Sequence, residues 1–215
     1  KRLGLEREQV FTSRTPLVME YVYALEGKLP PQTSGVLCYP SRTPCWPGTL
    51  SRQENMIPQI LRDDVLLYYP YHSMEPFLRL IRQASADPAV LSIRITIYRL
   101  ASNAKLVDYL CAAAENGKDV TVLMELRARF DEQNNIRWAE RLEQAGCTLL
   151  YGPEGYKVHS KICLITRRER GRIQYITQIG TGNYNEKTAR MYTDFSLMTA
   201  NPAIGADGAA FFQNM

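Results

Sequence analysis

One histidine lies in a sequence context that suits phosphoryl chemistry. His159 occurs in the run Lys157-Val-His-Ser-Lys161, and alternation along a strand would put Lys157, His159 and Lys161 on one face and Val158 and Ser160 on the other. Flanking ammonium groups disfavour the protonated imidazole, so this run predicts a neutral histidine nucleophile that meets a phosphate already surrounded by positive charge. The run is equally typical of a solvent-facing basic strand that contains a histidine by chance. The local pattern leaves both interpretations open.

Candidate anion-binding residues follow three other predicted strands. Arg99 comes after one strand, Arg127 and Arg129 come after the next, and the glycine-rich run Gly180-Thr-Gly-Asn183 comes after a third. In open α/β sheets, ligands collect at the carboxyl ends of strands. A guanidinium offers phosphate a planar fork of donors, and a glycine-rich turn lets backbone N–H groups approach an anion closely. We therefore expect an oxyanion or phosphate site there. The second histidine, His72, lies at a strand-to-helix junction, where we favour a structural or surface role.

The hydrophobic periodicity predicts the elements that must position these residues. The expected strands are Val65–Tyr69, Ala89–Leu100, Val120–Leu126, Cys147–Tyr151, Val158–Thr166, Ile173–Ile179 and Tyr192–Thr199. Helices are expected between the first four strands: one capped by Ser73, one over Asn103–Asn116 that ends at Gly117, and one over Asn134–Ala145 that ends at Gly146. The alternation predicts an α/β domain with a mixed, largely parallel sheet and helices on both faces. We expect the last strands to be antiparallel or mixed.

The first 48 residues differ in composition from the rest. Thr15–Leu25 could form a short helix with Pro16 in its first turn. Five prolines follow within 18 residues, a density that we expect to prevent regular structure: Pro30, Pro31, Pro40, Pro44 and Pro47. We interpret residues 1–48 as the end of a preceding domain with a Pro-rich linker, and residues 49–215 as the next domain.

The overall composition is that of an ordinary globular chain. Hydrophobic residues make up 45% and charged residues 22% of 215 residues, which excludes intrinsic disorder, collagen-like repeats and coiled coil. The five cysteines are scattered without C-x-x-C spacing, so we expect reduced thiols rather than a zinc site or a disulfide framework. No run of about 18 apolar residues is present that would predict a membrane span. The chain begins without Met and ends in mid-pattern, and we expect it to be an excerpt of a longer protein.

The motif around His159 resembles the half-site of the phospholipase D superfamily. The shared pattern is H-x-K, from His159 to Lys161, followed by G-x-G-N, which ends at Asn183. The resemblance implies that the histidine attacks phosphorus while the lysine and asparagine hold phosphate oxygens. That superfamily usually has an aspartate five residues after the lysine, and here the position is Thr166. This departure argues against an ordinary lipase or nuclease.

A longer set of motifs resembles the polyphosphate kinase family, which makes polyphosphate from ATP. The resemblance runs from about residue 36 to residue 201, and its motifs occur in order: Asp64-Val-Leu-Leu-Tyr-Tyr-Pro-Tyr-His-Ser, Ile97-Tyr-Arg-Leu, Glu125-Leu-Arg-Ala-Arg-Phe-Asp-Glu, Lys157-Val-His-Ser-Lys, Ile179-Gly-Thr-Gly-Asn-Tyr-Asn-Glu-Lys-Thr-Ala-Arg and Tyr192-Thr-Asp-Phe-Ser. It implies that His159 is phosphorylated by the γ-phosphate of ATP and passes this group reversibly to polyphosphate. Matches this long rarely arise by chance.

The same resemblance implies roles for further residues. Arg99 and Arg129 match the arginines of the family's Mg²⁺–phosphate site, and since a guanidinium has donors only, we expect both to bind phosphate oxygens beside the metal. Tyr192 matches the residue that packs on the nucleotide. From the residues alone Tyr192 starts a strand and would more often belong to the core.

Two acidic residues are weaker candidates for the metal. Asp131 and Glu132 could recruit Mg²⁺, although acidic residues after a strand are more often found at a helix N-terminus. Arg127 has less weight than Arg129, because it would point away from Arg129 if the strand continues.

The resemblance also implies partners and a setting. We expect ATP, ADP and inorganic polyphosphate as ligands, Mg²⁺ as cofactor, a homo-oligomer in the full protein, no specific nucleic acid, and a cytoplasmic location with or without peripheral attachment to the inner membrane. The family has a second, related half-site domain downstream, so we expect these 215 residues alone to be poorly active or inactive. Two alternatives remain: a phospholipase D-type phosphodiesterase or nuclease half-domain, and a non-enzymatic polyanion-binding module.

The distribution of charge supports a polyanionic ligand. Residues 157–190 contain eight Lys and Arg and two Glu, a net charge of +6, which leaves −2 for the rest of a chain whose total is +4. We expect residues 167–172 to form a hairpin tip. The remaining basic residues surround His159, where a chain of phosphates would lie.

Overall fold

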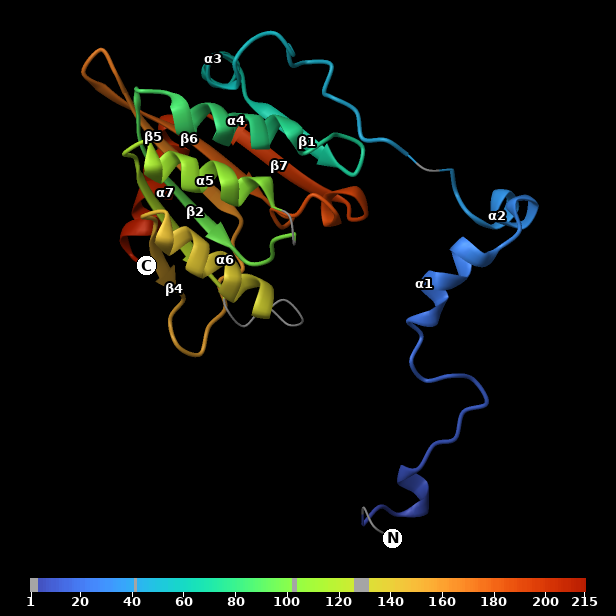
Figure 1. The fold of residues 1–215 in the computed structure, drawn as a ribbon. Coiled ribbons are helices and arrows are strands. Elements are labelled where there is room, and N and C mark those ends of the chain that lie inside the picture. Colours follow the sequence, from blue (N-terminus) through green and yellow to red (C-terminus); the bar gives the residue numbers. More distant parts are fainter. Residues whose placement is uncertain (1–3, 41, 102–103, 126–131) are drawn as a thin grey trace. The chain divides into compact units, whose positions relative to one another are not determined.

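The computed structural model describes residues 4–40, 42–101, 104–125 and 132–215, and the chain divides into two units, residues 1–42 and 43–215. The first unit contains η1 (Arg7–Gln9), α1 (Tyr21–Leu25), η2 (Glu26–Lys28) and α2 (Pro31–Leu37), as Figure 1 shows. None of the side chains described in this unit is buried.

Two expectations for the first unit are wrong. The helix expected over Thr15–Leu25 is confined to Tyr21–Leu25. The Pro-rich stretch does contain regular structure, the helix α2. Pro31 occupies the first turn of α2, where its missing N–H would have had no partner within the helix and its fixed φ suits helical geometry.

The second unit begins with α3 (Met56–Arg62) and then alternates strands and helices as expected. The order is β1 (Val65–Tyr69), α4 (Glu75–Ala86), β2 (Val90–Ile97), α5 (Lys105–Glu115), β3 (Asp119–Met124), α6 (Glu132–Gln144) and β4 (Thr148–Tyr151). Three more strands and a terminal helix follow: β5 (Ile162–Glu169), β6 (Arg172–Gly180), η3 (Thr188–Arg190), β7 (Asp194–Thr199) and α7 (Pro202–Gln213). Among the described residues, no helix has the length and apolar character needed to cross a membrane.

Local sequence signals explain where these helices begin and end. The Ser73 hydroxyl accepts a hydrogen bond from the backbone N–H of Glu75 at 3.1 Å at the start of α4. After α5 and α6, Gly117 and Gly146 have φ values of +77° and +90°. In this left-handed region glycine avoids the strain that a side chain would bring, so both glycines end their helices as predicted.

The seven strands form one mixed sheet in the order β1-β7-β6-β5-β2-β3-β4. The expectation of a largely parallel sheet is wrong for the pairing: β2–β3 and β3–β4 are parallel, whereas β1–β7, β7–β6, β6–β5 and β5–β2 are antiparallel. The strands β1 to β4 do run in one direction, as helical crossovers require. The hairpin-connected strands β5, β6 and β7 insert between β1 and β2, so most neighbours are antiparallel.

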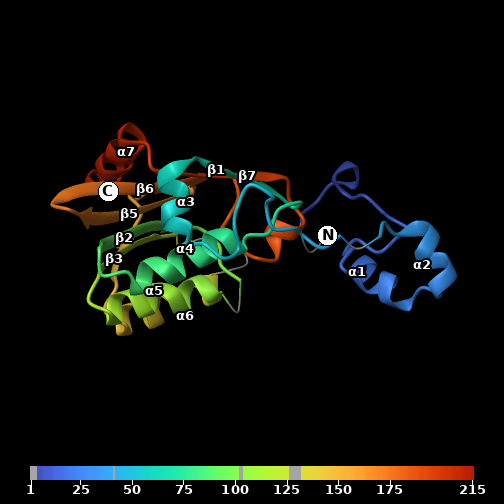
Figure 2. The ribbon, with the colours of Figure 1, turned by 90° about the horizontal axis from the view of Figure 1, so that it is seen from above.

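Helices cover both faces of the sheet, as expected. Figure 2 shows α4, α5 and α6 on one side and α7 on the other. The larger core lies under α3 to α6 and includes Met56, Phe77, Ile93 and Leu110. A smaller cluster under α7 contains Leu123, Val158, Leu164 and Phe212.

The strand directions bring several chain segments to one edge of the sheet. The strands β2, β3 and β6 run the same way, so Arg99, Glu125 and the Gly180–Asn183 turn follow strand ends at that edge. Because β5 and β7 run the opposite way, they start at this edge, directly after Lys161 and at Asp194. The topology therefore gathers the candidate residues without requiring them to be close in sequence.

Candidate active site

A cavity of about 370 Å³ lies at this edge and is here called the site pocket. It is lined by the five candidate side chains for catalysis and for ATP or phosphate binding that the structure describes. Arg99, His159, Lys161, Asn183 and Tyr192 line it together. The remaining lining residues are Tyr98, Thr181, Gly182, Thr188 and Asp194. The sequence thus selected seven of the ten lining residues, because Thr181 and Gly182 belong to the Gly180–Asn183 run.

The segment that carries His159 differs from the predicted strand. Strand β5 begins only at Ile162, and Lys157–Lys161 has no ladder partner. Its side chains do not alternate, because Val158 and Lys161 are buried whereas Lys157, His159 and Ser160 are exposed. The expectation that Lys157, His159 and Lys161 share one face is therefore wrong. Without ladder hydrogen bonds on both sides, nothing imposes a period of two on this segment.

The electrostatic surroundings of His159 favour its neutral form, as the sequence predicted. The positive charge of Lys161 is the main cause that lowers the pKa of His159 below its ordinary value, and partial burial lowers it further. The sequence attributed this effect to both flanking lysines, but in the structure it comes from Lys161. A neutral ring keeps a nitrogen lone pair available for attack on phosphorus.

Lys161 is the more buried of the two flanking lysines, with 6% of its surface exposed. Burial lowers the pKa of Lys161, while the nearby Asp194 opposes this effect. The Nζ group donates to the backbone carbonyl of His159 at 2.5 Å and lies 5.5 Å from the centre of the Tyr98 ring. The ammonium is therefore held beside the histidine and points into the site pocket.

Tyr98 contacts three candidate residues at once. Its ring meets the His159 ring edge to face, with centroids 5.1 Å apart and planes at 73°. The Arg99 guanidinium lies 5.6 Å from the same ring, on which Lys161 also stacks. Such cation–π contacts are worth about 0.5–2 kcal/mol each, depending on exposure. Sequence reasoning missed Tyr98, although its place beside Arg99 in the Ile97-Tyr-Arg-Leu motif was a usable signal.

Asp194 ties the glycine-rich turn to strand β7. Its Oδ1 accepts a hydrogen bond from the Thr181 hydroxyl at 2.7 Å, and the Phe195 N–H donates to that hydroxyl at 3.0 Å. Gly182 leaves room for the carboxylate, because a Cβ built there would come within 2.5 Å of Asp194 Oδ2. Sequence reasoning missed Asp194 as well, although it lies in the quoted Tyr192-Thr-Asp-Phe-Ser motif.

The asparagine of the turn presents an unused acceptor. Asn183 Oδ1 is buried and has no hydrogen-bond partner among the described residues. The next residue, Tyr184, is buried, donates to Gln178 Oε1 at 2.5 Å and stacks on Phe77 with ring centroids 5.0 Å apart. The turn is thus anchored behind Asn183, and the Asn183 amide is left at the site pocket to bind a ligand.

Tyr192 lies outside the strand expected for it. Strand β7 begins at Asp194, and Tyr192 is 61% exposed between η3 and that strand. The interpretation of Tyr192 as a core residue that starts a strand is therefore wrong. An exposed aromatic ring on the wall of a polar pocket suits stacking against a planar ligand.

Other predicted residues lie elsewhere or outside the described ranges. Arg127, Arg129 and Asp131 fall in residues 126–131, which the structure does not describe. Glu132 is exposed in the first turn of α6 and does not line the site pocket. His72 Nδ1 accepts the Tyr68 N–H at 3.1 Å, which supports the structural role favoured for it.

The basic segment 157–190 divides into a site part and a hairpin part. Arg170 and Gly171 form the turn between β5 and β6, so the hairpin is confirmed. Arg167 is not at its exposed tip: it is 7% exposed and pairs with Glu169 at 2.6 Å and Asp87 at 3.9 Å. Thr166, at the position of the superfamily aspartate, lies in β5 and does not line the site pocket.

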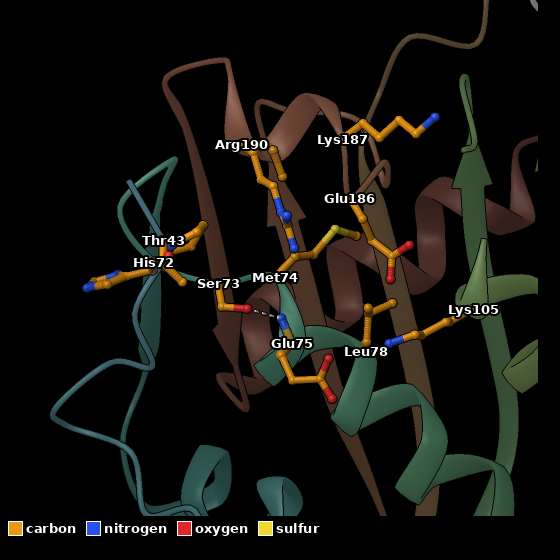
Figure 3. A pocket seen from close by; sticks show the side chains of 12 residues that line it. Thr43, His72, Ser73, Met74, Glu75, Leu78, Lys105, Glu186, Lys187 and Arg190 are labelled. Atoms are coloured by element: carbon orange, nitrogen blue, oxygen red, sulfur yellow. Dashed lines mark hydrogen bonds between the residues drawn. The ribbon is translucent and has the colours of Figure 1, made fainter. Parts of the chain in front are cut away.

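A second cavity of about 400 Å³ has Glu186, Lys187 and Arg190 in its lining (Figure 3). Lys187, Ala189 and Arg190 line this cavity, whereas Thr188 and Tyr192 line the site pocket. Its lining mixes cations with two carboxylates, Glu75 and Glu186. Burial is the main cause that raises the pKa of Glu186, opposed by the charge of Lys105. The mixed charges do not favour an anion here over a cation.

The fold is that of a phospholipase D-like α/β domain. The structure of Nuc from Salmonella typhimurium, a phospholipase D family member, superimposes with a TM-score of 0.56 at 18% identity and covers 71% of this chain and 92% of that one. At this identity the match establishes the shared fold only.

The particular family is defined by closer matches. Residues 55–215 match the family model of polyphosphate kinase C-terminal domain 1, and the chain belongs to this family. Polyphosphate kinase of Bacillus cereus is 42% identical over 210 residues, which cover 98% of this chain and 30% of the relative. The crystal structure of polyphosphate kinase from Porphyromonas gingivalis matches with a TM-score of 0.73 at 39% identity, over 86% of this chain and 31% of that one. The chain thus spans about 30% of the length of these relatives.

Proposed function

We propose that this chain is the phosphohistidine-bearing part of a polyphosphate kinase, which transfers the γ-phosphate of ATP to the end of a polyphosphate chain and also runs in reverse. The observation that carries the proposal is the convergence of His159, Lys161, Asn183, Arg99 and Tyr192 in one pocket. Family membership supports it, since the matched relatives are polyphosphate kinases.

The proposed reaction proceeds in two transfers. A ring nitrogen of neutral His159 attacks the γ-phosphorus of ATP, the nitrogen–phosphorus bond forms, the bond to the bridging oxygen breaks, and ADP leaves. A terminal phosphate oxygen of polyphosphate then attacks the same phosphorus, and the imidazole leaves with its electron pair. Such an intermediate divides one difficult transfer into two easier ones. The lowered pKa of His159 supports its role as nucleophile and as leaving group.

The neighbouring side chains neutralise and hold the phosphoryl oxygens. Phosphoryl transfer requires mainly positioning and charge neutralisation from a protein. Lys161 provides an ammonium beside His159, Asn183 provides a side-chain amide, and Arg99 provides a planar fork of donors. By resemblance, Arg129 joins Arg99 on the phosphates. Tyr192 packs against the base of the nucleotide, a role supported by its exposed ring on the wall of the pocket.

We further propose Mg²⁺ as the cofactor. Mg²⁺ binds through one or two carboxylates together with substrate phosphates. The described residues contain no cluster of three or more His, Cys, Asp or Glu side chains that could hold a metal by themselves, but Asp194 presents a carboxylate at the site pocket. These donors fit a cation that enters with the nucleotide, because Asp194 can supply one oxygen while Arg99 binds phosphate oxygens only. Bound Mg²⁺ would supply charge neutralisation on the transferring phosphate.

Completion of the site by another part of the longer protein is also part of the proposal. The chain covers about 30% of its relatives. By resemblance to the phospholipase D superfamily, its site would pair with a second half-site. We expect ATP-dependent synthesis only from the longer protein, acting as a homo-oligomer, and little or none from these 215 residues.

A labelling experiment tests the proposal. The full-length protein is incubated with γ-labelled ATP and assayed for acid-labile, alkali-stable label. His159→Ala should abolish the label, and the matched control His72→Ala should retain it because His72 lies outside the site pocket. Label that persists in His159→Ala would contradict the proposal. Cleavage of a phosphodiester without ATP would favour the phospholipase D-type alternative, and polyphosphate binding with neither reaction would favour the binding module.

A further inference from the structure

The Lys161 carbonyl accepts the Gly180 N–H of β6 at 2.9 Å, but the rest of the nucleophile segment, residues 157–160, precedes the β-ladder and must be held by other contacts. The ladder between β2 and β5 reaches only to Ile95 and Cys163, and β5 begins at Ile162. His159 lies three residues before that start and is exposed. A segment with unpaired backbone would fluctuate unless side chains bind its polar groups.

On one side of His159, the segment is bound by a buried carboxylate. Glu125, directly after β3, is 6% exposed, and its Oε2 accepts the Val158 N–H at 2.9 Å. The Val158 side chain is itself buried at 5% exposure in the cluster under α7. A Cβ built on Gly152 would come within 2.5 Å of Val158 Cγ2, so the valine is also tightly enclosed from the β4 side.

On the other side of His159, the segment is bound by a buried hydroxyl. Thr96 Oγ1 donates to the Ser160 carbonyl at 2.7 Å and accepts the Ile162 N–H at 3.1 Å. Thr96 is 1% exposed, and its residue number is 64 and 66 lower than those of its two partners. The β2–β5 ladder ends at Ile95, and the Thr96 hydroxyl makes the next two bonds from β2 to the nucleophile segment and the start of β5.

The backbone of Glu125, which carries the carboxylate, is itself fixed in place. The Glu125 N–H donates to the Ile97 carbonyl at 2.9 Å, and the Glu125 carbonyl accepts from Asn135 Nδ2 at 2.8 Å. A charged side chain is costly to bury, so this placement requires compensating hydrogen bonds. The bond to Val158 supplies one such charge-assisted contact.

We infer that Glu125 and Thr96 are positioning residues for His159, which brace its backbone from both sides and aim the ring into the site pocket. The inference rests on the proposed function for its kinetic consequence. Neither side chain lines the site pocket, so nucleotide binding through Tyr192 and Arg99 should be unaffected. Misplacement of a nucleophile by about 1 Å can cost about 10²-fold in rate.

The test uses the full-length protein and two independent readouts. Thr96→Val keeps the side-chain shape without the hydroxyl, Thr96→Ser restores the hydroxyl, and Glu125→Leu removes the acceptor. Glu140→Leu on the exposed face of α6 is the matched control. The readouts are amide hydrogen exchange over residues 157–162 and the single-turnover rate of His159 labelling at saturating ATP.

The expected pattern separates positioning from general destabilisation. In Thr96→Val and Glu125→Leu, the amide hydrogens of residues 157–162 should exchange faster. Labelling of His159 should be about 10²-fold slower, and the affinity for ATP should be unchanged. Thr96→Ser and Glu140→Leu should match the parent in both readouts. Parent-like exchange and labelling in Thr96→Val would overturn the inference, as would an equal loss of ATP affinity and rate.

The two readouts also separate this inference from the proposed function. If the parent protein acquires no label on His159, the proposed function fails, but the exchange data still decide whether the brace exists. If Glu125→Leu does not fold, the isosteric Thr96→Val with its Thr96→Ser rescue decides by itself.

Discussion

Replacement of Asn135 should destabilise the α/β unit far more than its single polar side chain suggests. Asn135 is fully buried in α6, and its Nδ2 donates to the Tyr98 carbonyl at 2.9 Å and to the Glu125 carbonyl at 2.8 Å. These carbonyls follow β2 and β3, so one amide joins two strand ends at the site edge. Asn135→Ala leaves both without this donor, at about 1–3 kcal/mol for each buried group left unpaired. The substitution also removes Asn135 Oδ1, which is buried without a hydrogen-bond partner among the described residues, and this offsets part of the cost. We therefore expect a net loss of about 2–4 kcal/mol in the free energy of unfolding.

The measurement is urea and thermal unfolding of the protein beside matched variants. At about 2–4 °C per kcal/mol, Asn135→Ala should lower the melting temperature by about 5–15 °C. Asn135→Asp should be at least as harmful, because carboxylate oxygens would face two carbonyls. Asn134→Ala loses one bond, to the Leu100 carbonyl at 3.1 Å in a partly buried setting, and should cost about 1 kcal/mol. Equal losses below about 1 kcal/mol for Asn135→Ala and Asn134→Ala would refute the reasoning.

Substitutions at three further positions test the site itself. Lys161→Met removes the main cause of the lowered His159 pKa, so that pKa should rise towards its ordinary value; since the protonated ring cannot attack, the acid limb of the labelling rate should move to higher pH. Gly182→Ala should displace Asp194, whose Oδ2 lies 2.5 Å from the new Cβ. This variant should label His159 more slowly, and its free energy of unfolding should fall by about 1–3 kcal/mol. Tyr98→Phe keeps the ring against His159 and should label almost as fast as the parent, whereas Tyr98→Leu should label more slowly.

Matched controls make these predictions decisive. Lys157→Met removes an exposed lysine of the same segment, and an acid limb that moved as far as in Lys161→Met would refute the assignment to Lys161. Gly48→Ala adds a Cβ with nothing within 4 Å and should unfold like the parent. Equal behaviour of Gly182→Ala and Gly48→Ala would contradict the packing argument. Equal labelling rates for Tyr98→Leu and Tyr98→Phe would show that the aromatic ring of Tyr98 does not contribute to labelling of His159.

The chain composition and motifs by themselves predicted the candidate residues and most of the local elements. The run around His159, the turn ending at Asn183 and the arginine at position 99 could be selected from residue type and spacing, because a strand end or a glycine-rich turn is a local property. The alternation from β1 to β4 was equally readable, since each helix and strand carries its own hydrophobic period. The motifs and their order were sufficient to suggest the family.

Only the tertiary structure decided which strands are neighbours and how the nucleophile is held. The insertion of β5, β6 and β7 between β1 and β2 depends on which sheet faces become buried, a property of the whole chain. Lys157 and Lys161 look equivalent in sequence, yet one is exposed and the other buried beside Tyr98. The bonds from Glu125 to Val158 and from Thr96 to Ser160 join residues 33 and 64 positions apart. Spacing along the chain carries no signal for such contacts, because they form only when the folded sheet brings separate strand ends to one edge.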